Sequence, residues 1–188
     1  MGNGAFAIFA VPIGSGILFS DRITPQKTFW ENSGMIITFC GHRNVFLSPE
    51  EEQTLQKILL DILSSSPDAV FYLGGYGRFD EICDHALKTL QKDYPLLKRI
   101  FVTPYLEPSY CRQREAEGYD DILYPFVEKV PPRLAILKRN QWMIDRSDVV
   151  VAYVTHPFGG ANETLAYAKK RKKRIIFVIN NEKNTPRF

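Results

Sequence analysis

The sequence predicts one open, doubly wound α/β domain with a mainly parallel sheet. Several short segments are apolar along their whole length, which is typical of strands that are covered on both faces. These segments alternate with stretches of helical periodicity, and the alternation favours parallel strands joined by right-handed crossovers. The chain has 188 residues, of which 45% are hydrophobic and 24% charged, so it fits a single domain with a substantial core.

The elements follow one another regularly from Met35 onward. Residues 48–51, Ser-Pro-Glu-Glu, open a helix, because Ser is a favoured N-cap, Pro suits the first helical turn and Glu completes a capping box. Later helices are indicated by apolar residues on one face. The predicted strands are 35–40, 69–73, 99–103, 149–154 and 174–179. The predicted helices cover 48–64, the stripe from Ile82 to Leu90, the region 136–144 and 163–172.

The segment 104–133 is the least regular part of the chain. It mixes aromatic residues, charges and prolines, and we expect an irregular strand near Asp121–Leu123. Long loops inside compact domains often have a function. A loop or lid beside a binding site and a simple surface connection are both compatible with the pattern.

Residues 1–34 differ in character from the rest. Their apolar run, GAFAIFAVPIGSGILF, is interrupted by Pro12 and Gly14 and is too short to span a membrane. No Lys or Arg precedes it, so the basic start of a signal peptide is missing. We expect residues 1–34 to form an appendage outside the fold and residues 35–188 to form the domain. Association with a membrane surface is the alternative for the appendage.

Composition narrows the compartment and the partners. The three cysteines form no CxxC pair, which indicates neither a disulfide framework nor a zinc site. We therefore expect a cytoplasmic protein with reduced thiols, no metal and no cofactor. The net charge of +3 does not imply a nucleic-acid partner. The basic run 169–173 resembles a nucleic-acid patch, but at a helix C-terminus it also offsets the helix dipole, and we favour the second interpretation. Homo-oligomerisation is left open.

Three loops should lie together at one edge of the sheet. Open α/β sheets bind ligands beyond the carboxyl ends of their strands, so the loops that follow the first, second and fourth predicted strands are the ones to inspect. Two of these loops run glycines into a helix N-terminus, where free N–H groups and the helix dipole favour an anion such as phosphate. The expected ligand contacts in these loops are Gly41, His42, Arg43, Gly74, Gly75, Gly77, Arg78, Gly159, Gly160 and Thr164.

Arg139 is a further candidate from outside these loops. Ile136, Met143 and Ile144 can pack inward at helical spacing, and Arg139 then lies off that apolar face. In this position its guanidinium is expected either to point toward the crevice or to be solvated.

Four motifs in fixed order resemble one known family. FCGHR, LGGYGRFD, RNQWMIDRSDVVVAYV and GGANETLAYA are similar to motifs of the SLOG superfamily, most closely of its YpsA-like branch of uncharacterised bacterial proteins. The resemblance covers about residues 35–179. It implies a Rossmann-like domain that binds a nucleotide or an ADP-ribose-like ligand, as a sensor or regulatory domain. It also implies a ligand site formed by Gly41, Arg43, Gly74, Gly75, Gly77, Arg139, Gly159, Gly160 and Thr164.

One departure from the family bears on catalysis. Lonely Guy phosphoribohydrolases of this superfamily carry the motif PGGxGTxxE, whose Glu assists cleavage of the N-glycosidic bond. If Thr164 takes the place of the motif threonine, the acidic position falls on Tyr167, which has no carboxylate. Glu163, Asp80 and Glu81 are the remaining catalytic candidates. We therefore favour ligand binding, with hydrolysis of nucleoside monophosphates as the alternative and single-stranded DNA binding as a third function.

Overall fold

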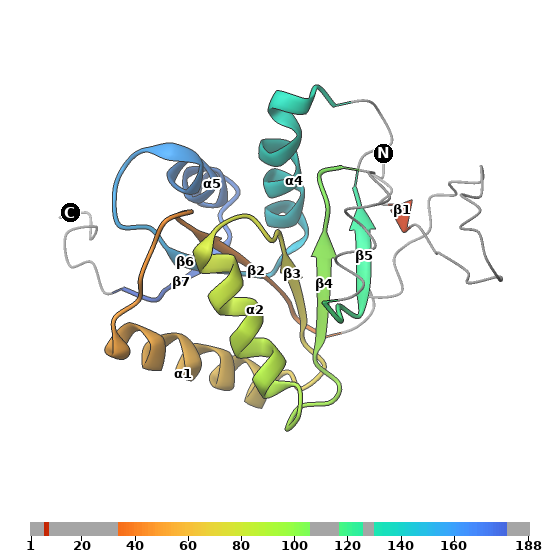
Figure 1. Ribbon diagram of the computed structural model, residues 1–188, viewed down its shortest axis with the longest axis vertical. Coiled ribbons are helices and arrows are strands. Elements are labelled where there is room, and N and C mark those ends of the chain that lie inside the picture. The colour runs from red at the N-terminus through yellow and green to blue at the C-terminus, as the bar shows by residue number, and fades with distance from the viewer. Residues whose placement is uncertain (1–5, 8–33, 106–116, 126–129, 180–188) are drawn as a thin grey trace.

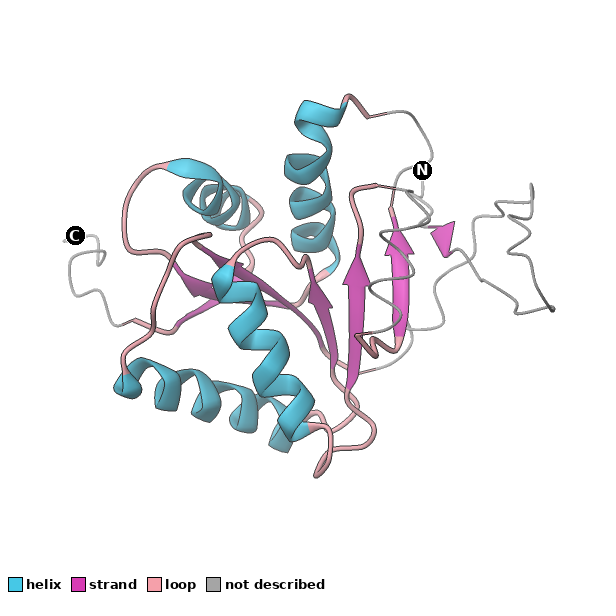
Figure 2. Ribbon diagram, viewed as in Figure 1, coloured by secondary structure: helices cyan, strands magenta, loops and turns pink. Residues whose placement is uncertain are grey.

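The computed structural model describes residues 6–7, 34–105, 117–125 and 130–179, and it confirms the predicted fold class. A single sheet runs through the domain, with helices on both of its faces (Figure 1 and Figure 2). All six strands from β2 to β7 pair in parallel. The chain therefore forms an open, doubly wound, Rossmann-like domain.

The strand order is β1-β5-β4-β3-β2-β6-β7, so β2, the first of the parallel strands along the chain, lies in the interior between β3 and β6. The central strands are buried along nearly their whole length, which explains why the sequence shows continuous apolar runs rather than alternation. The parallel strands are β2 (Ile36–Gly41), β3 (Val70–Leu73), β4 (Lys98–Val102), β5 (Asp121–Tyr124), β6 (Val149–Tyr153) and β7 (Arg174–Phe177).

Among the described residues, two helices cover each face of the sheet. On one face, α1 and α2 pack over Ile37, Phe39 and Phe71. On the other face, α4 and α5 pack against each other and over Val150 and Ala152. Within the described ranges no helix is both long and apolar enough to cross a membrane. The helices are α1 (Pro49–Ser65), α2 (Arg78–Leu90), α4 (Pro132–Arg146) and α5 (Gly159–Lys170).

Helix starts match the sequence prediction at α1 and differ from it at α5. At α1 the predicted capping box is formed: Ser48 accepts from the Glu51 N–H, and Glu51 accepts from the Ser48 N–H. The predicted start of the last helix near Glu163 is four residues late, because Gly159 and Gly160 already lie in its first turn. Glycine has low helix propensity, so the pattern alone places this boundary too far along the chain.

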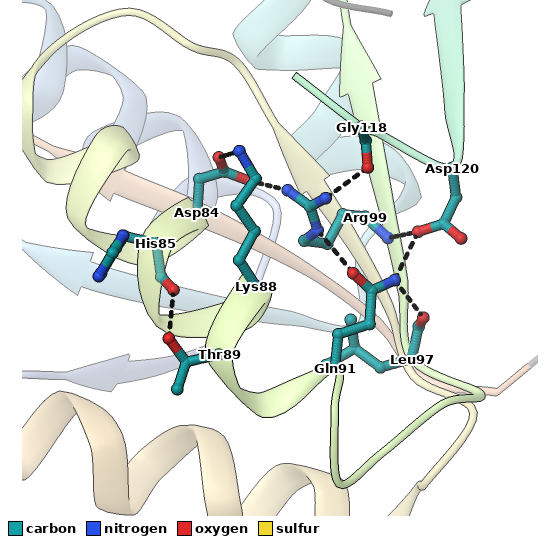
Figure 3. Close-up of polar contacts among 9 residues, drawn as sticks. All are labelled: Asp84, His85, Lys88, Thr89, Gln91, Leu97, Arg99, Gly118 and Asp120. Atoms are coloured by element: carbon teal, nitrogen blue, oxygen red, sulfur yellow. Dashed lines mark hydrogen bonds and ion pairs between the residues drawn. The ribbon is translucent and has the colours of Figure 1, made fainter. Parts of the chain in front are cut away.

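The irregular strand expected near Asp121–Leu123 is confirmed as β5. It is tied to the rest of the sheet by Arg99, a buried residue of β4 (Figure 3). The Arg99 guanidinium donates to the carboxylate of Asp84 of α2 at 2.6 Å. It also donates to the carbonyl of Gly118, which lies just before β5. The Arg99 N–H donates to the carboxylate of Asp120 at 2.9 Å. This network lies away from the carboxyl edge of the sheet and holds α2, β4 and β5 together.

Of the N-terminal segment, only β1 (Phe6–Ala7) lies within the described residues. It pairs antiparallel with β5, with Phe6 opposite Tyr124 and Ala7 opposite Leu123. The parallel strands, the helices and the hydrophobic clusters that the structure describes all lie within residues 34–179.

We predict that a chain lacking residues 1–34 unfolds cooperatively. The described part of the removed segment pairs two residues with β5, so we expect the free energy of unfolding to fall by no more than about 2 kcal/mol. Urea denaturation followed by circular dichroism and by fluorescence should show coincident transitions. A truncated chain with native helix content but no cooperative transition would contradict this prediction.

Candidate functional site

The sheet reverses its direction of growth at β2. From β2 the chain adds β3, β4 and β5 on one side, and it then returns to add β6 and β7 on the other. Open α/β sheets bind ligands at such a switch point, in the crevice beyond the carboxyl ends of the strands. The loops after β2 and β6 therefore frame the candidate site, and the loop after β3 adjoins them (Figure 1).

These three loops contact one another, and the loop after β2 joins the other two. On one side, the Arg78 N–H donates to the Arg43 carbonyl at 2.8 Å. On the other side, the His156 N–H donates to Nε2 of His42 at 3.3 Å. The His42 and His156 rings stack with centroids 3.4 Å apart. The structure thus brings together the loops in which the sequence predicted the site.

Packing or backbone conformation within the protein requires several of the predicted site glycines. A Cβ on Gly41 would lie 2.2 Å from the Phe79 ring. A Cβ on Gly77 would lie 2.7 Å from the Arg43 Cα, and Gly77 also has a φ of 109°. Gly75 has a φ of 66°, which L side chains rarely adopt. Packing and backbone conformation therefore explain these glycines without any ligand.

Arg139 reaches the carboxyl edge of the sheet from inside the protein. Its side chain is only 1% exposed, so the expectation that it lies off the packed face of its helix is wrong. Its Nη1 donates to the carbonyls of Gly74 and Val102 at 2.6 and 2.8 Å. The guanidinium also lies 5.3 Å from the centroid of the Tyr76 ring. A Cβ on Gly74 would lie 2.5 Å from Nη1, so Gly74 makes room for this arginine.

The loop after β3 has its own internal anion. The half-buried Asp80 accepts from the Tyr76 N–H at 3.3 Å, and the N–H groups of Gly74 and Gly75 also stabilise its carboxylate. Burial raises the pKa of Asp80, while Arg139 and these N–H groups oppose the rise. A carboxylate of the protein thus already occupies the place where the glycine loop could hold a phosphate.

The N-terminus of α5 has the opposite character. Its N-cap, Phe158, provides no side-chain hydrogen bond, and the first turn contains no acidic residue. Gly159 and Gly160 are both exposed, and apart from the adjoining backbone a Cβ on either would meet no atom of the described residues within 4 Å. The first-turn N–H groups of this helix therefore have no capping side chain, and an anion can approach the glycines unhindered.

Thr164 stabilises the first turn of α5 from its buried side. It is buried, and its hydroxyl donates to the Gly160 carbonyl at 2.8 Å. The same hydroxyl oxygen accepts from Asn140 Nδ2 of α4 at 3.3 Å. The structure therefore places Thr164 as a support of the first turn of α5 rather than on its exposed surface.

The remaining candidates do not gather at this turn. Arg78 pairs with Glu81 at 3.2 Å on the exposed start of α2. Both residues line a cavity of about 570 Å³ between α1 and α2. Arg43 and Glu163 are exposed, the first in the loop after β2 and the second on α5. Among the described residues no cluster of three or more His, Cys, Asp or Glu side chains could hold a metal ion.

The two stacked histidines form the most unusual part of the site. His42 is 6% exposed, and burial, followed by the proximity of His156, lowers its pKa. Nε2 of His42 must be unprotonated to accept from the His156 N–H. Nδ1 of His156 is buried and, within the described part of the chain, makes no hydrogen bond. Burial and the bond accepted by Nε2 therefore favour the neutral form of His42.

The sequence reasoning included the loop His156-Pro157-Phe158 but did not single out its rings. His156 stacks on His42, and Phe158 stacks on His156 with centroids 4.0 Å apart. An aromatic residue directly before a glycine pair at the end of a strand is the signal that marks this position. Asn140 was also not singled out, since nothing in its helix indicates a partner on α5.

Comparisons with known proteins support the fold. No family model matches the sequence, and a search of curated proteins finds no match. DNA processing protein A (DprA) from Helicobacter pylori, solved for its single-stranded DNA binding mode, has a TM-score of 0.56 at 21% identity, covering 80% of this chain and 68% of its own. DprA from Streptococcus pneumoniae has a TM-score of 0.53 at 17% identity, covering 76% of this chain and 50% of its own. The molybdenum cofactor carrier protein of Chlamydomonas reinhardtii also matches, with a TM-score of 0.47 at 15% identity, covering 76% and 75%.

The two DprA structures define the class of fold. The chain has a Rossmann-like domain with the fold of these DprA structures. The chain spans half the length of the pneumococcal protein. At these identities the likeness concerns the fold alone.

We predict that Arg139→Met lowers the free energy of unfolding by about 3 kcal/mol. The substitution removes charged hydrogen bonds to two backbone carbonyls inside the protein. Lys138→Met, at an exposed position of the same helix, is the control and should change stability by less than about 0.5 kcal/mol. Urea denaturation measures both variants, and equal stability of the two would contradict a structural role for Arg139.

We also predict an acid-dependent loss of stability that depends on His42. Because the folded state lowers the pKa of His42, the unfolded chain binds the proton more readily below the ordinary value near 6.5. Its stabilising contribution is therefore complete above pH 6.5 and is lost as the pH falls toward the lowered pKa. His42→Phe keeps a ring in the stack but cannot titrate.

The measurement is the difference in melting temperature between wild type and His42→Phe from pH 7.5 to pH 5. Below pH 6.5, the melting temperature of the wild type should fall relative to that of His42→Phe. Asp80, whose raised pKa has the opposite effect on stability, is present in both proteins and cancels. A difference that is constant across this range would show that His42 does not titrate in the way proposed.

Proposed function

We propose that this protein binds a phosphate-bearing, nucleotide-like ligand at the N-terminus of α5, beside the loop after β2. The observation that carries the proposal is the uncapped first turn of α5 at the switch point of the sheet. Gly159 and Gly160 are open to solvent there, and no acidic side chain opposes an anion. The role of a sensor or regulatory domain and the YpsA-like assignment follow from the motif resemblance and are part of this proposal.

The contrast among the N-termini of α1, α2 and α5 supports the choice of α5 over α1 and α2. At α1, the capping box of Ser48 and Glu51 satisfies the N–H groups. At α2, Asp80 and Glu81 both lie in the first turn, and the carboxylate of Asp80 accepts from N–H groups of the preceding loop. Only α5 among these three presents its positive end without a carboxylate. Arg43, exposed in the neighbouring loop, can add a charge-assisted hydrogen bond to the same ligand.

The contacts of the candidate catalytic residues favour ligand binding over hydrolysis. Tyr167, in the position of the family's acid, donates its hydroxyl to both carboxylate oxygens of Asp145, at 3.1 and 3.0 Å. Asp80 is engaged by loop N–H groups and Glu81 by Arg78. Glu163 is the one exposed candidate on α5 itself, so hydrolysis of a nucleoside monophosphate by this chain would depend on it.

Single-stranded DNA is the second candidate partner, because DprA of Helicobacter pylori binds it and shares this fold. In this chain the basic run 169–173 lies at the opposite end of α5 from the glycines, about 18 Å away along a helix of 12 residues. Part of that run is already used: Arg171 pairs with Asp145, and Lys173 donates to the carbonyls of Asp145 and Ser147. These contacts favour a small ligand over a strand.

We predict opposite effects of Gly160→Asp on stability and on binding. A negative charge in the first turn should raise the free energy of unfolding by about 0.3–1 kcal/mol relative to Gly160→Asn, because it complements the helix dipole. The same charge should weaken binding of ribose 5-phosphate and of nucleoside monophosphates at least tenfold relative to Gly160→Asn. Thermal unfolding and isothermal titration calorimetry provide the two measurements.

The neutral Asn variant controls for side-chain bulk, since Asn and Asp have nearly the same shape. Equal affinity of the two variants would show that no anion binds at this helix. Free base released during the titrations would indicate hydrolysis, and Glu163→Gln should then abolish it. An oligonucleotide complex that weakens steeply with salt but is unaffected by Gly160→Asp would favour the DNA alternative.

A further inference from the structure

Three aromatic rings form a continuous stack at the switch point. The His42 and His156 rings lie 3.4 Å apart at 18°, and the His156 and Phe158 rings lie 4.0 Å apart at 23°. The stack therefore runs from the buried His42, in the loop after β2, to the N-cap of α5. Its inner end, His42, is almost completely buried, and its outer end is not.

The outer ring is unusual for its position. Phe158 is 67% exposed although one of its faces is covered by His156, so its other face is open to solvent. It is also the N-cap of α5, where Ser, Thr, Asp or Asn is favoured, and it makes no side-chain hydrogen bond there. Neither core packing nor helix capping explains a large apolar side chain at this position.

The two loops that carry the stack are joined by a hydrogen bond. The His156 N–H donates to Nε2 of His42, which holds the loop after β6 against the loop after β2. Phe158 then continues directly into the first turn of α5. A ring that is held in one orientation loses little conformational freedom when a second flat group stacks on it.

We propose that the open face of Phe158 stacks against the nucleobase of the ligand whose phosphate binds at the N-terminus of α5. This inference rests on the proposed function and adds the chemical class of the second half of the ligand. Every nucleobase has a π-face, so stacking of this kind tolerates different bases. Phe158 adjoins Gly159 in the chain, so one short segment of backbone provides both the platform and the anion site.

The stack makes a distinct prediction about which compounds bind tightly. At least one of the four ribonucleoside 5′-monophosphates should bind more tightly than ribose 5-phosphate, by roughly tenfold to a hundredfold, since both compounds carry the same phosphate and only one carries a base. Phe158→Ala should remove most of this difference while leaving the affinity for ribose 5-phosphate unchanged. Because the Phe158 ring is exposed, we expect Phe158→Ala to fold normally.

The experiment is isothermal titration calorimetry of the full chain with these five compounds. The variants are wild type, Phe158→Ala, Phe158→Trp and Phe46→Ala. Phe46 is the matched control, because it is 89% exposed in the loop before α1 and is not part of the stack. Phe158→Trp should retain tight binding of the monophosphates, and its added fluorescence, relative to wild type, should be quenched when a base stacks on the indole.

The outcomes separate this inference from the proposed function. If wild type binds ribose 5-phosphate and the four monophosphates equally, the stacking platform is wrong and the anion site remains. If Phe158→Ala weakens all five compounds equally, Phe158 acts on the helix turn and not on a base, which also overturns the inference. If none of the five compounds binds, both the proposed function and the platform fail.

Discussion

The carboxyl edge of the sheet depends on the buried guanidinium of Arg139. It joins α4 to the ends of two neighbouring strands by donating to the carbonyls of Gly74 and Val102. A buried charge of this kind is tolerated only when it is well hydrogen-bonded, so the backbone around it must keep one arrangement. Gly74 has no side chain because the guanidinium takes that space. The order of the loop after β3 is thus a consequence of one arginine on a distant helix.

The same constraint changes the meaning of the glycine-rich loop. Asp80 lies beside Arg139 and accepts from loop N–H groups, so positive and negative charges are balanced inside the protein. A loop that already holds a carboxylate has little left to attract a phosphate. Glycines at a strand end therefore have two physical explanations, internal packing and ligand approach. Gly74 has the first explanation, whereas Gly160 faces open space, which leaves room for the second.

The fold could be predicted because its signals are local. Continuous apolar strands, the capping box at Ser48 and the strand near Asp121 are each visible within a few residues, and each was confirmed. The orientation of Arg139 could not be predicted, since its carbonyl acceptors lie 65 and 37 residues away in the chain. The convergence of three loops followed from topology, while the stacking of His42 on His156 depends on side-chain packing that no periodicity reveals.

A nucleotide and a single strand of DNA share phosphate and base, so one edge of this fold can in principle serve either. The two ligands differ in where a second phosphate would lie. In this chain the nearest helix N-termini on the α1 and α2 side are occupied by carboxylates, at Glu51 and at Asp80. The basic residues of α5 lie at its far end, and two of them are bonded to the end of α4. Beyond the turn at Gly159 and Gly160, a second phosphate at the N-termini of α1 and α2 would meet these carboxylates. The charge distribution thus suits a ligand with its phosphates confined to one turn of helix.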